Sequence, residues 1–148
     1  MSLIDTLNAD LKTAMKARDK ATLAVVRMLK AAVTNEQIKL GHELNEQEGL
    51  AVLATELKQR KESLDEFQKA GRDDLVTPLQ GEIKIVEHYL PQQLTEAEVS
   101  DLVTTTVAKL NATSTKDFGK VMQTLMPQVK GRADGALVNR LVKSALTK

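Results

Sequence analysis

The chain has 148 residues, 42% of them apolar, with a formal net charge of +1 and no cysteine. The lack of cysteine excludes disulfides and thiolate chemistry, and no apolar run approaches the roughly 18 residues that a membrane-spanning helix needs. Aromatic residues make up 2% and helix formers dominate, so the composition favours an all-α protein with an aliphatic core. Asp5 and Asp10 in the first helical stretch are unlike a signal or transit peptide, and we expect a cytoplasmic location without membrane association.

Two amphipathic helices are predicted at the start of the chain. The first spans residues 3–17, where apolar side chains recur at spacings of three and four. The second begins after Asp19 and runs to about Leu40, and Gly41 takes the position that a left-handed cap favours.

A third helix opens at Asn45, which forms a capping-box pattern with Glu48 three residues later. Its apolar residues step by threes and fours like a heptad seam, and Arg60 stands where the next apolar residue belongs. We interpret Arg60 as an ion-paired or snorkelling seam residue rather than a functional cation. The third helix ends at Ala70-Gly71.

The tetrad Thr-Pro-Leu-Gln at residues 77–80 looks like a helix start, with threonine as the cap and proline at the first helical position. Residues 72–76 can form a separate helical turn before it. Pro91 restricts Leu90 and ends this fourth helix. We therefore predict an N-terminal four-helix domain over residues 1–92, from which the third and fourth helices project as a long hairpin.

Three further helical patterns predict a C-terminal three-helix bundle over residues 93–148. A capping box begins at Thr95, Ser114 and Asp117 cap the second helix, and Asp134 starts the third. A bundle of this size is marginal, and we expect it to be docked on the first domain.

Basic residues gather in the C-terminal third of the chain. Residues 1–92 hold 13 Lys/Arg against 15 Asp/Glu, whereas from Ser114 onward the count is 7 against 2. Helix N-termini at Ser114 and Asp134 are expected to add partial positive charge suited to phosphate oxygens. Six cations from three successive elements are expected to meet on one surface: Lys116, Lys120, Lys130, Arg132, Arg140 and Lys143.

Glycines occupy unusual positions in the same region. Gly119 lies inside an apolar-periodic run, where glycine costs about 1 kcal/mol relative to alanine, and such a helix usually needs close approach by another helix or a ligand. Gly131 and Gly135 bracket a loop in which backbone can approach a ligand without Cβ interference. The alternative reading is that the cations are ordinary solvated side chains, Gly131 a turn residue and Asp134 only an N-cap. Because Phe118 is the lone aromatic beside these cations, a bound RNA would be read by backbone and shape.

Short motifs along the chain match those of a known family. Those of the first domain are Arg27-Met28-Leu29-Lys30-Ala31, Lys61-Glu62-Ser63, Ala70-Gly71-Arg72, Asp74-Leu75, Glu82-Ile83 and Tyr89-Leu90-Pro91-Gln92-Gln93-Leu94. Those of the second, the most specific, are Gly119-Lys120-Val121-Met122 and Lys130-Gly131-Arg132-Ala133-Asp134-Gly135. With these motifs the chain resembles the YqeY family, also called GatB/YqeY-domain proteins, over nearly its full length. Its second domain resembles the C-terminal tail of the B subunit of the tRNA-dependent amidotransferase.

The resemblance implies a two-domain, all-helical protein whose C-terminal domain is similar to a tRNA-contacting module. Members of the family are associated with carbon–nitrogen ligase activity that uses glutamine as the amide donor. Carried over by position, the tRNA-facing candidates are Gly119, Lys120, Lys130, Gly131, Arg132 and Asp134, to which the charge pattern adds Lys116, Arg140 and Lys143.

The residues themselves supply no catalytic constellation. There is no Gly-x-x-x-x-Gly-Lys-[Ser/Thr] loop, and His42 and His88 lie in different elements without metal-ligand spacing. We therefore predict no catalytic residue, no cofactor and no metal, and expect any amidotransferase association to come through the tail-like domain. The main hypothesis is tRNA binding by the 114–148 surface. The alternatives are a protein-interaction adaptor that uses an exposed seam of the hairpin formed by residues 45–69 and 78–90, and, third, a stand-alone or assisting amidotransferase.

Overall fold

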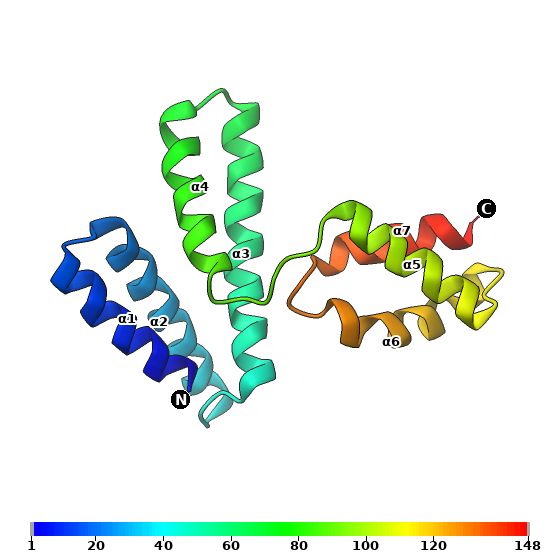
Figure 1. The fold of residues 1–148 in the computed structure, drawn as a ribbon, viewed down its shortest axis with the longest axis horizontal. Coiled ribbons are helices and arrows are strands. Elements are labelled where there is room, and N and C mark those ends of the chain that lie inside the picture. The colour runs from blue at the N-terminus through cyan, green and yellow to red at the C-terminus, as the bar shows by residue number, and fades with distance from the viewer. Residues whose placement is uncertain (1, 148) are drawn as a thin grey trace. The chain divides into compact units, whose positions relative to one another are not determined.

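Two compact units make up the chain in the computed structural model, which describes residues 2–147. The first unit runs to Leu90 and the second begins at Pro91. The described residues form seven α-helices and one short 3-10 helix, with no strand (Figure 1). The predicted all-α class is confirmed.

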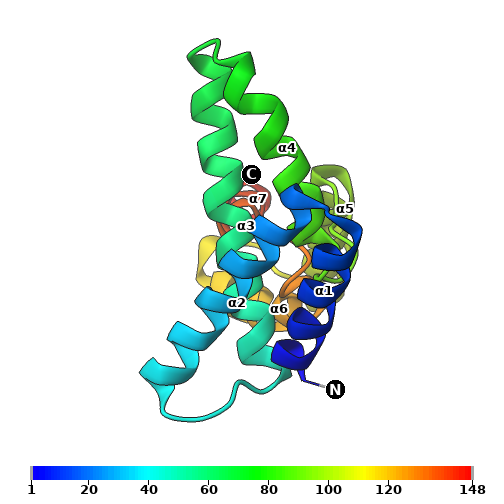
Figure 2. The ribbon, with the colours of Figure 1, turned by 90° about the vertical axis from the view of Figure 1, so that its left-hand side faces the viewer.

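Unit 1 contains four helices. They are α1 (Leu3–Ala17), α2 (Lys20–Leu40), α3 (Glu46–Lys69) and α4 (Asp73–Glu87). Helix α1 packs along α2, α3 packs along α4, and α2 contacts both α3 and α4. The α3–α4 hairpin extends past the α1–α2 pair, as two perpendicular views show (Figures 1 and 2).

An aliphatic cluster forms the core of unit 1. It consists of Leu7, Val25, Val26, Leu29, Val33, Leu53, Leu57, Leu79, Ile83, Val86 and Leu90. Full burial of a Val or Leu side chain contributes about 1.5–3 kcal/mol, so the apolar stripes of the four helices are the main source of stability.

The seam between α3 and α4 lies inside this core. Leu53 and Leu57 are buried in the same cluster as Leu79 and Ile83. That part of the seam is therefore not the exposed docking surface that the adaptor hypothesis assumes. Among the described residues of unit 1, the exposed large apolar side chains lie on α1 and α2: Met15, Met28, Ile38 and Leu40.

The predicted start of the fourth helix at Thr77 is wrong. Helix α4 begins at Asp73 and continues through Pro78 without a break. Proline lacks the N–H that would bond to the carbonyl of Asp74, and an interior proline costs a helix about 3 kcal/mol. Here Pro78 is exposed, whereas Val76 and Leu79 beside it are buried. Burial of the apolar stripe outweighs the local signal for a helix start.

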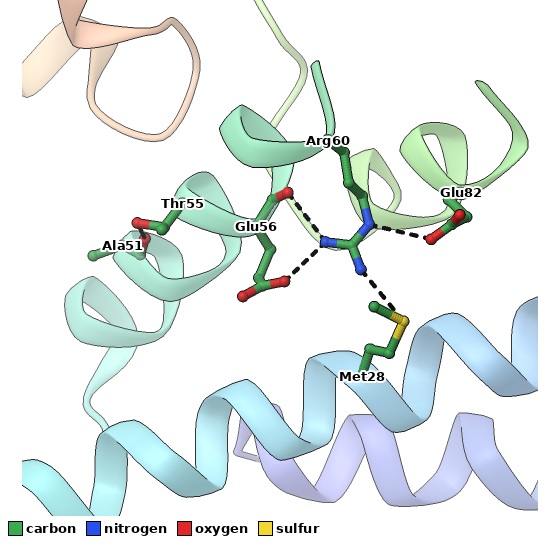
Figure 3. Close-up of polar contacts among 6 residues, drawn as sticks. All are labelled: Met28, Ala51, Thr55, Glu56, Arg60 and Glu82. Atoms are coloured by element: carbon green, nitrogen blue, oxygen red, sulfur yellow. Dashed lines mark hydrogen bonds and ion pairs between the residues drawn. The ribbon is translucent and has the colours of Figure 1, made fainter. Parts of the chain in front are cut away.

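Arg60 is a buried cation within α3, with only 5% of its surface exposed. Its Nη1 donates to Oε2 of Glu56 at 2.8 Å and to the Glu56 carbonyl at 3.1 Å. Its Nε lies 3.5 Å from Oε1 of Glu82 on α4, and its Nη2 lies 3.8 Å from the sulfur of Met28 on α2 (Figure 3). The interpretation of Arg60 as an ion-paired seam residue is confirmed, and its side chain links three helices.

Unit 2 contains three α-helices and the 3-10 helix. They are α5 (Glu96–Leu110), η1 (Thr115–Asp117), α6 (Phe118–Val129) and α7 (Gly135–Leu146). Each α-helix contacts the other two around a core of eight buried residues: Val99, Val103, Val121, Leu125, Val129, Val138, Val142 and Leu146. This is the predicted three-helix bundle.

The predicted cap of α6 at Ser114 is wrong in its position. The Ser114 hydroxyl accepts the N–H of Lys116 and caps η1, whereas α6 begins at Phe118. The carboxylate of Asp117 accepts the N–H of Thr113 at 3.0 Å and makes no cap bond to α6. The N-terminus that was expected at Ser114 is thus a three-residue turn with little dipole of its own.

Candidate functional site

The loop between α6 and α7, residues 130–134, turns at Gly131. This residue has φ of 75°, in the left-handed region that glycine reaches without steric cost. At the end of the loop, the Asp134 side chain accepts the N–H of Ala136 at 3.1 Å and caps α7 as predicted. Gly135 is the first residue of α7, where a Cβ would meet nothing within 4 Å. Gly131 and Asp134 therefore have structural roles whatever else they do.

Hydrogen bonds join the same loop to residues 91–94, the entering segment with which unit 2 begins. The Nε2 of Gln93 donates to the carbonyl of Gly131 at 2.8 Å and to that of Pro91 at 2.9 Å. Beside it, the N–H of Leu94 donates to the carbonyl of Arg132 at 2.7 Å. Two consecutive carbonyls of the loop are thus held by two consecutive residues of the entering segment.

Arg132 is anchored by its side chain as well. Its Nε donates to the carbonyl of Gln92 at 3.2 Å. The guanidinium carries further N–H donors on its two terminal nitrogens, and these have no protein partner among residues 2–147. Lys130, two residues earlier, is the C-cap residue that follows α6 and is exposed. The loop therefore presents two cations: the Arg132 guanidinium, which is hydrogen-bonded through Nε, and the exposed ammonium group of Lys130.

The outer face of α7 carries Arg140 and Lys143. Nη2 of Arg140 pairs with Oε1 of Glu96, the first residue of α5, at 3.1 Å, and both side chains are more than 60% exposed. Nζ of Lys143 lies 5.8 Å from the centre of the Phe118 ring, within range of a cation–π contact. Phe118 is half-buried, which agrees with a packing role.

Lys116 in η1 and Gly119 and Lys120 in the first turn of α6 are all exposed. Lys116 belongs to η1 and Lys120 to α6, so the α-helical spacing that placed them on one face does not apply. A Cβ at Gly119 would meet nothing within 4 Å, so the expected close approach by another helix is wrong. Gly119 is the second residue of α6, where the cost of an interior glycine does not apply in full. Approach by a ligand stays a prediction.

The nine candidates therefore fall into three groups within unit 2: the start of α6, the α6–α7 loop and the outer face of α7. Lys143 lies over the Phe118 ring at the start of α6, and Arg140 pairs with Glu96 at the start of α5. Arg132, in turn, holds Gln92 in the segment that leads to α5. Sequence reasoning missed Gln93 as part of this network, since an uncharged amide beside a proline gives no signal of its own.

Unit 1 contains a groove of about 400 Å³ between α1, the start of α2 and the end of α4. The Tyr89 hydroxyl donates to Asp10 across it, and the Thr22 hydroxyl donates to Asp19 at 2.7 Å. Burial, followed by the hydrogen bond to Asp10 and the charge of that carboxylate, raises the pKa of Tyr89 well above its usual range. These polar groups are thus engaged with one another.

Among residues 2–147, no three His, Cys, Asp or Glu side chains are grouped so as to hold a metal ion. None of the helices in that part of the chain has the length and apolar character needed to cross a bilayer.

Fold and site together define an all-helical protein of two units whose second unit is a three-helix bundle with a basic loop and a basic outer helix face. The chain belongs to the YqeY family: the family model described as Yqey-like protein matches residues 4–146.

Three fungal relatives share the name altered inheritance of mitochondria protein 41, mitochondrial. The protein from Pyrenophora tritici-repentis is 28% identical, over 97% of this chain and 81% of its own length. The one from Saccharomyces cerevisiae is 32% identical, over 88% of this chain and 70% of its own. The one from Lachancea thermotolerans is 34% identical, over 72% of this chain and 59% of its own.

Proposed function

We propose that the protein binds tRNA, or an RNA of similar structure, through unit 2. The observation that carries this proposal is the state of Arg132. Its guanidinium is fixed at Nε by the Gln92 carbonyl, while its terminal nitrogens have no protein partner among residues 2–147. A guanidinium held in this way loses less freedom when it binds a phosphate, and arginine pairs with phosphate oxygens in a planar, two-bond geometry.

The surrounding charges support the same assignment. Lys116, Lys120 and Lys130 are exposed. Electrostatic attraction to phosphates supplies most of the affinity of a surface of this kind, and it needs no recognition of bases. The N–H groups at the start of α7 add donors of the kind that phosphate oxygens accept.

The proposed RNA is structured rather than single-stranded. Proteins that bind single strands stack bases on exposed aromatic side chains. The chain has no tryptophan, and Phe118, the aromatic residue of unit 2, is half-buried beneath Lys143. Shape and backbone contacts are what such a surface can offer.

The association with glutamine-dependent carbon–nitrogen ligase activity belongs to the same proposal. In it, unit 2 holds the tRNA and a separate enzyme performs the amide transfer, because the residues of this chain suggest no nucleophile, ATP loop or ammonia route of their own. The test is an assay of glutamine-dependent amide transfer to an aminoacylated tRNA by the purified chain alone. Activity in this assay would contradict the proposal that a separate enzyme performs the transfer.

A tRNA binding titration across salt concentrations tests the proposal. If four to six phosphates are neutralised, the plot of log K against log salt has a slope of about −3 to −5. The double variant Lys120→Glu/Lys130→Glu is expected to weaken binding and to make that slope shallower by about 2. Glutamate is well tolerated in the first turn of α6, so the change at Lys120 leaves the helix intact.

The matched control is Lys12→Glu/Lys61→Glu, which changes the net charge by the same amount at exposed positions of unit 1. An equal loss of affinity in both variants would show a non-local charge effect and count against a site in unit 2. No measurable binding by the native chain at low salt would remove the proposal altogether.

A cytoplasmic location of this protein is a further part of the proposal. The relatives named above are mitochondrial by name, so the compartment of this chain needs its own measurement. Imaging of a fluorescent fusion decides it, and a signal confined to an organelle would contradict the prediction.

A non-catalytic adaptor remains the second candidate, favoured by the exposure of Ile38 at 75% and Met28 at 51% on α2. In this candidate, a partner protein binds the apolar side chains of α2. Ile38→Ser would then abolish the partner complex and leave tRNA affinity unchanged. A partner complex that survives this substitution would discard the candidate.

A further inference from the structure

Gln93 is an uncharged side chain at the centre of the contacts that hold the basic loop. Its amide nitrogen has two N–H donors, and both are used: one on the Gly131 carbonyl at 2.8 Å and one on the Pro91 carbonyl at 2.9 Å. Gln93 is half-buried, whereas its neighbour Gln92 is exposed. One side chain thus bridges the entering segment and the turn residue of the loop.

Two other bonds cross between the same pieces of backbone. The Leu94 N–H donates to the Arg132 carbonyl at 2.7 Å, and the Arg132 Nε donates to the Gln92 carbonyl at 3.2 Å. Together with the Gln93 bond to Gly131, they join residues 92–94 to residues 131 and 132. All partners belong to unit 2, so the network forms whatever the placement of unit 1.

We propose that Gln93 is a positioning residue for RNA binding, which holds the Lys130–Arg132 loop in the conformation that presents its cations. This inference rests on the function proposed above and deepens it. Gln93 itself contacts no RNA phosphate. It fixes the Gly131 carbonyl, and with it the left-handed turn that sets the direction of the backbone between Lys130 and Arg132.

A consequence for the entering segment follows from thermodynamic linkage. If a fixed loop binds RNA better than a free loop, then bound RNA must in turn favour the fixed loop. Because the loop is fixed by residues 92–94, RNA binding is expected to protect the amides of that segment. This effect is absent if the loop and the segment are independent.

The test compares Gln93→Met, which keeps the side-chain length and removes both donors, with Gln92→Met at the exposed neighbouring position. In Gln93→Met without RNA, hydrogen exchange at the Leu94, Arg132 and Ala133 amides is expected to rise by about fivefold to tenfold, the factor that loss of one or two net hydrogen bonds gives. Amides of the α5 and α7 core are expected to exchange at the native rate. Gln92→Met is expected to match the native chain throughout.

The RNA arm separates positioning from charge. Gln93→Met removes no cation, so tRNA affinity is expected to fall by about fivefold to tenfold while the salt slope stays at its native value. Protection of the Leu94 amide on addition of tRNA is expected in the native chain and is expected to be weaker in Gln93→Met. A merely structural role would raise exchange in the core of unit 2 and would leave no such difference in RNA protection.

The outcomes distinguish the two proposals. Native tRNA affinity in Gln93→Met would overturn the positioning role and leave the RNA-binding function standing. A native chain that fails to bind tRNA would remove the function, and with it the role assigned to Gln93, even if the loop amides exchanged faster in the variant.

Discussion

Nη1 of Arg60 lies 2.8 Å from Oε2 of Glu56, one turn earlier on the same helix, although only 5% of Arg60 is exposed. A second carboxylate, that of Glu82 on α4, lies 3.5 Å from Nε, which makes no hydrogen bond in the described part of the chain. A buried cation must recover its desolvation cost through such partners, and this geometry recovers it only in part. The side chain therefore contributes less to stability than its number of contacts suggests, yet it is costly to truncate.

Arg60→Ala is expected to lower the free energy of unfolding of unit 1 by about 2–4 kcal/mol, because it leaves two carboxylates near an apolar seam and removes a packed stem. Arg60→Met keeps most of the packed stem but leaves the same two carboxylates without their partner, so it is expected to be destabilising by less than Arg60→Ala. Tyr89, the single tyrosine of a chain without tryptophan, reports on unit 1 by its fluorescence in urea. Equal destabilisation by both variants would contradict this account.

Tyr89 also gives a prediction about alkaline pH. Burial and the bond to Asp10 raise the pKa of Tyr89 in the folded chain above the value of about 10 that it has when unfolded. The unfolded chain then loses a proton that the folded chain keeps, so this contribution to stability is complete below about pH 10 and declines as pH rises further.

Absorbance of tyrosinate near 295 nm measures this directly, since no other tyrosine contributes. The band is expected at higher pH in native protein than in urea. Asp10→Asn removes the carboxylate charge and is expected to move the native curve part of the way back, with burial accounting for the rest. Coincident native and unfolded curves would show that Tyr89 is not buried as described.

The helices could be predicted well where an apolar period and a cap agreed. Asn45 and Gly41 mark the ends of helices as expected, because each signal there is local and unopposed. Pro78 misled the prediction for the opposite reason: its strong local preference is overridden by burial of Val76 and Leu79, which depends on α3 and cannot be read from the tetrad. Ser114 misled it because a hydroxyl caps a 3-10 turn and an α-helix by the same bond.

The residue types of the candidate site could be predicted from the sequence, but their hydrogen-bond and ion-pair partners could not. Charge counting finds Arg132 and Arg140, yet it cannot tell that one is held by a backbone carbonyl and the other by Glu96. Those partners lie about 40 residues away in the chain, with separations of 40 and 44. Contacts of this kind, from a guanidinium to a distant carbonyl or carboxylate, leave no periodic trace in a sequence.

Glu96 is expected to restrain RNA binding. Its carboxylate pairs with Arg140 at 3.1 Å, and a phosphate at Arg140 must compete with it. Glu96→Gln is expected to raise tRNA affinity by about threefold to tenfold and to alter stability by less than about 0.5 kcal/mol, because both side chains are exposed and such pairs contribute little. Glu98→Gln, in the same turn of α5, is the control for net charge, with a separate stability measurement because Glu98 belongs to a capping box. Equal gains in affinity for the two variants would show that Arg140 has no particular role.

Arg132→Lys tests whether the anchored guanidinium matters beyond its charge. Lysine keeps the positive charge but has neither the planar fork nor the Nε that bonds to Gln92. We expect tRNA affinity to fall by about tenfold with a native salt slope, since the number of cations is unchanged. Native affinity in this variant would reduce Arg132 to one charge among several.

Gly119 and Gly131 give opposite expectations for the same substitution to alanine. At Gly131, φ of 75° makes any Cβ strained, and Gly131→Ala is expected to destabilise unit 2 by about 1–2 kcal/mol and to weaken RNA binding as the loop shifts. At Gly119 a Cβ meets only open space within a helix, so Gly119→Ala is expected to stabilise by about 0.5 kcal/mol.

RNA affinity then decides whether Gly119 belongs to the binding surface. If RNA backbone approaches α6 at this residue, Gly119→Ala is expected to reduce affinity in a protein that is more stable than the native one, a combination that misfolding cannot produce. Hydrogen exchange at Val121 and Val142 measures the stability of unit 2, and a tRNA titration at fixed salt measures affinity. Unchanged affinity in the stabilised variant would remove Gly119 from the proposed surface and leave Lys130 and Arg132 as its centre.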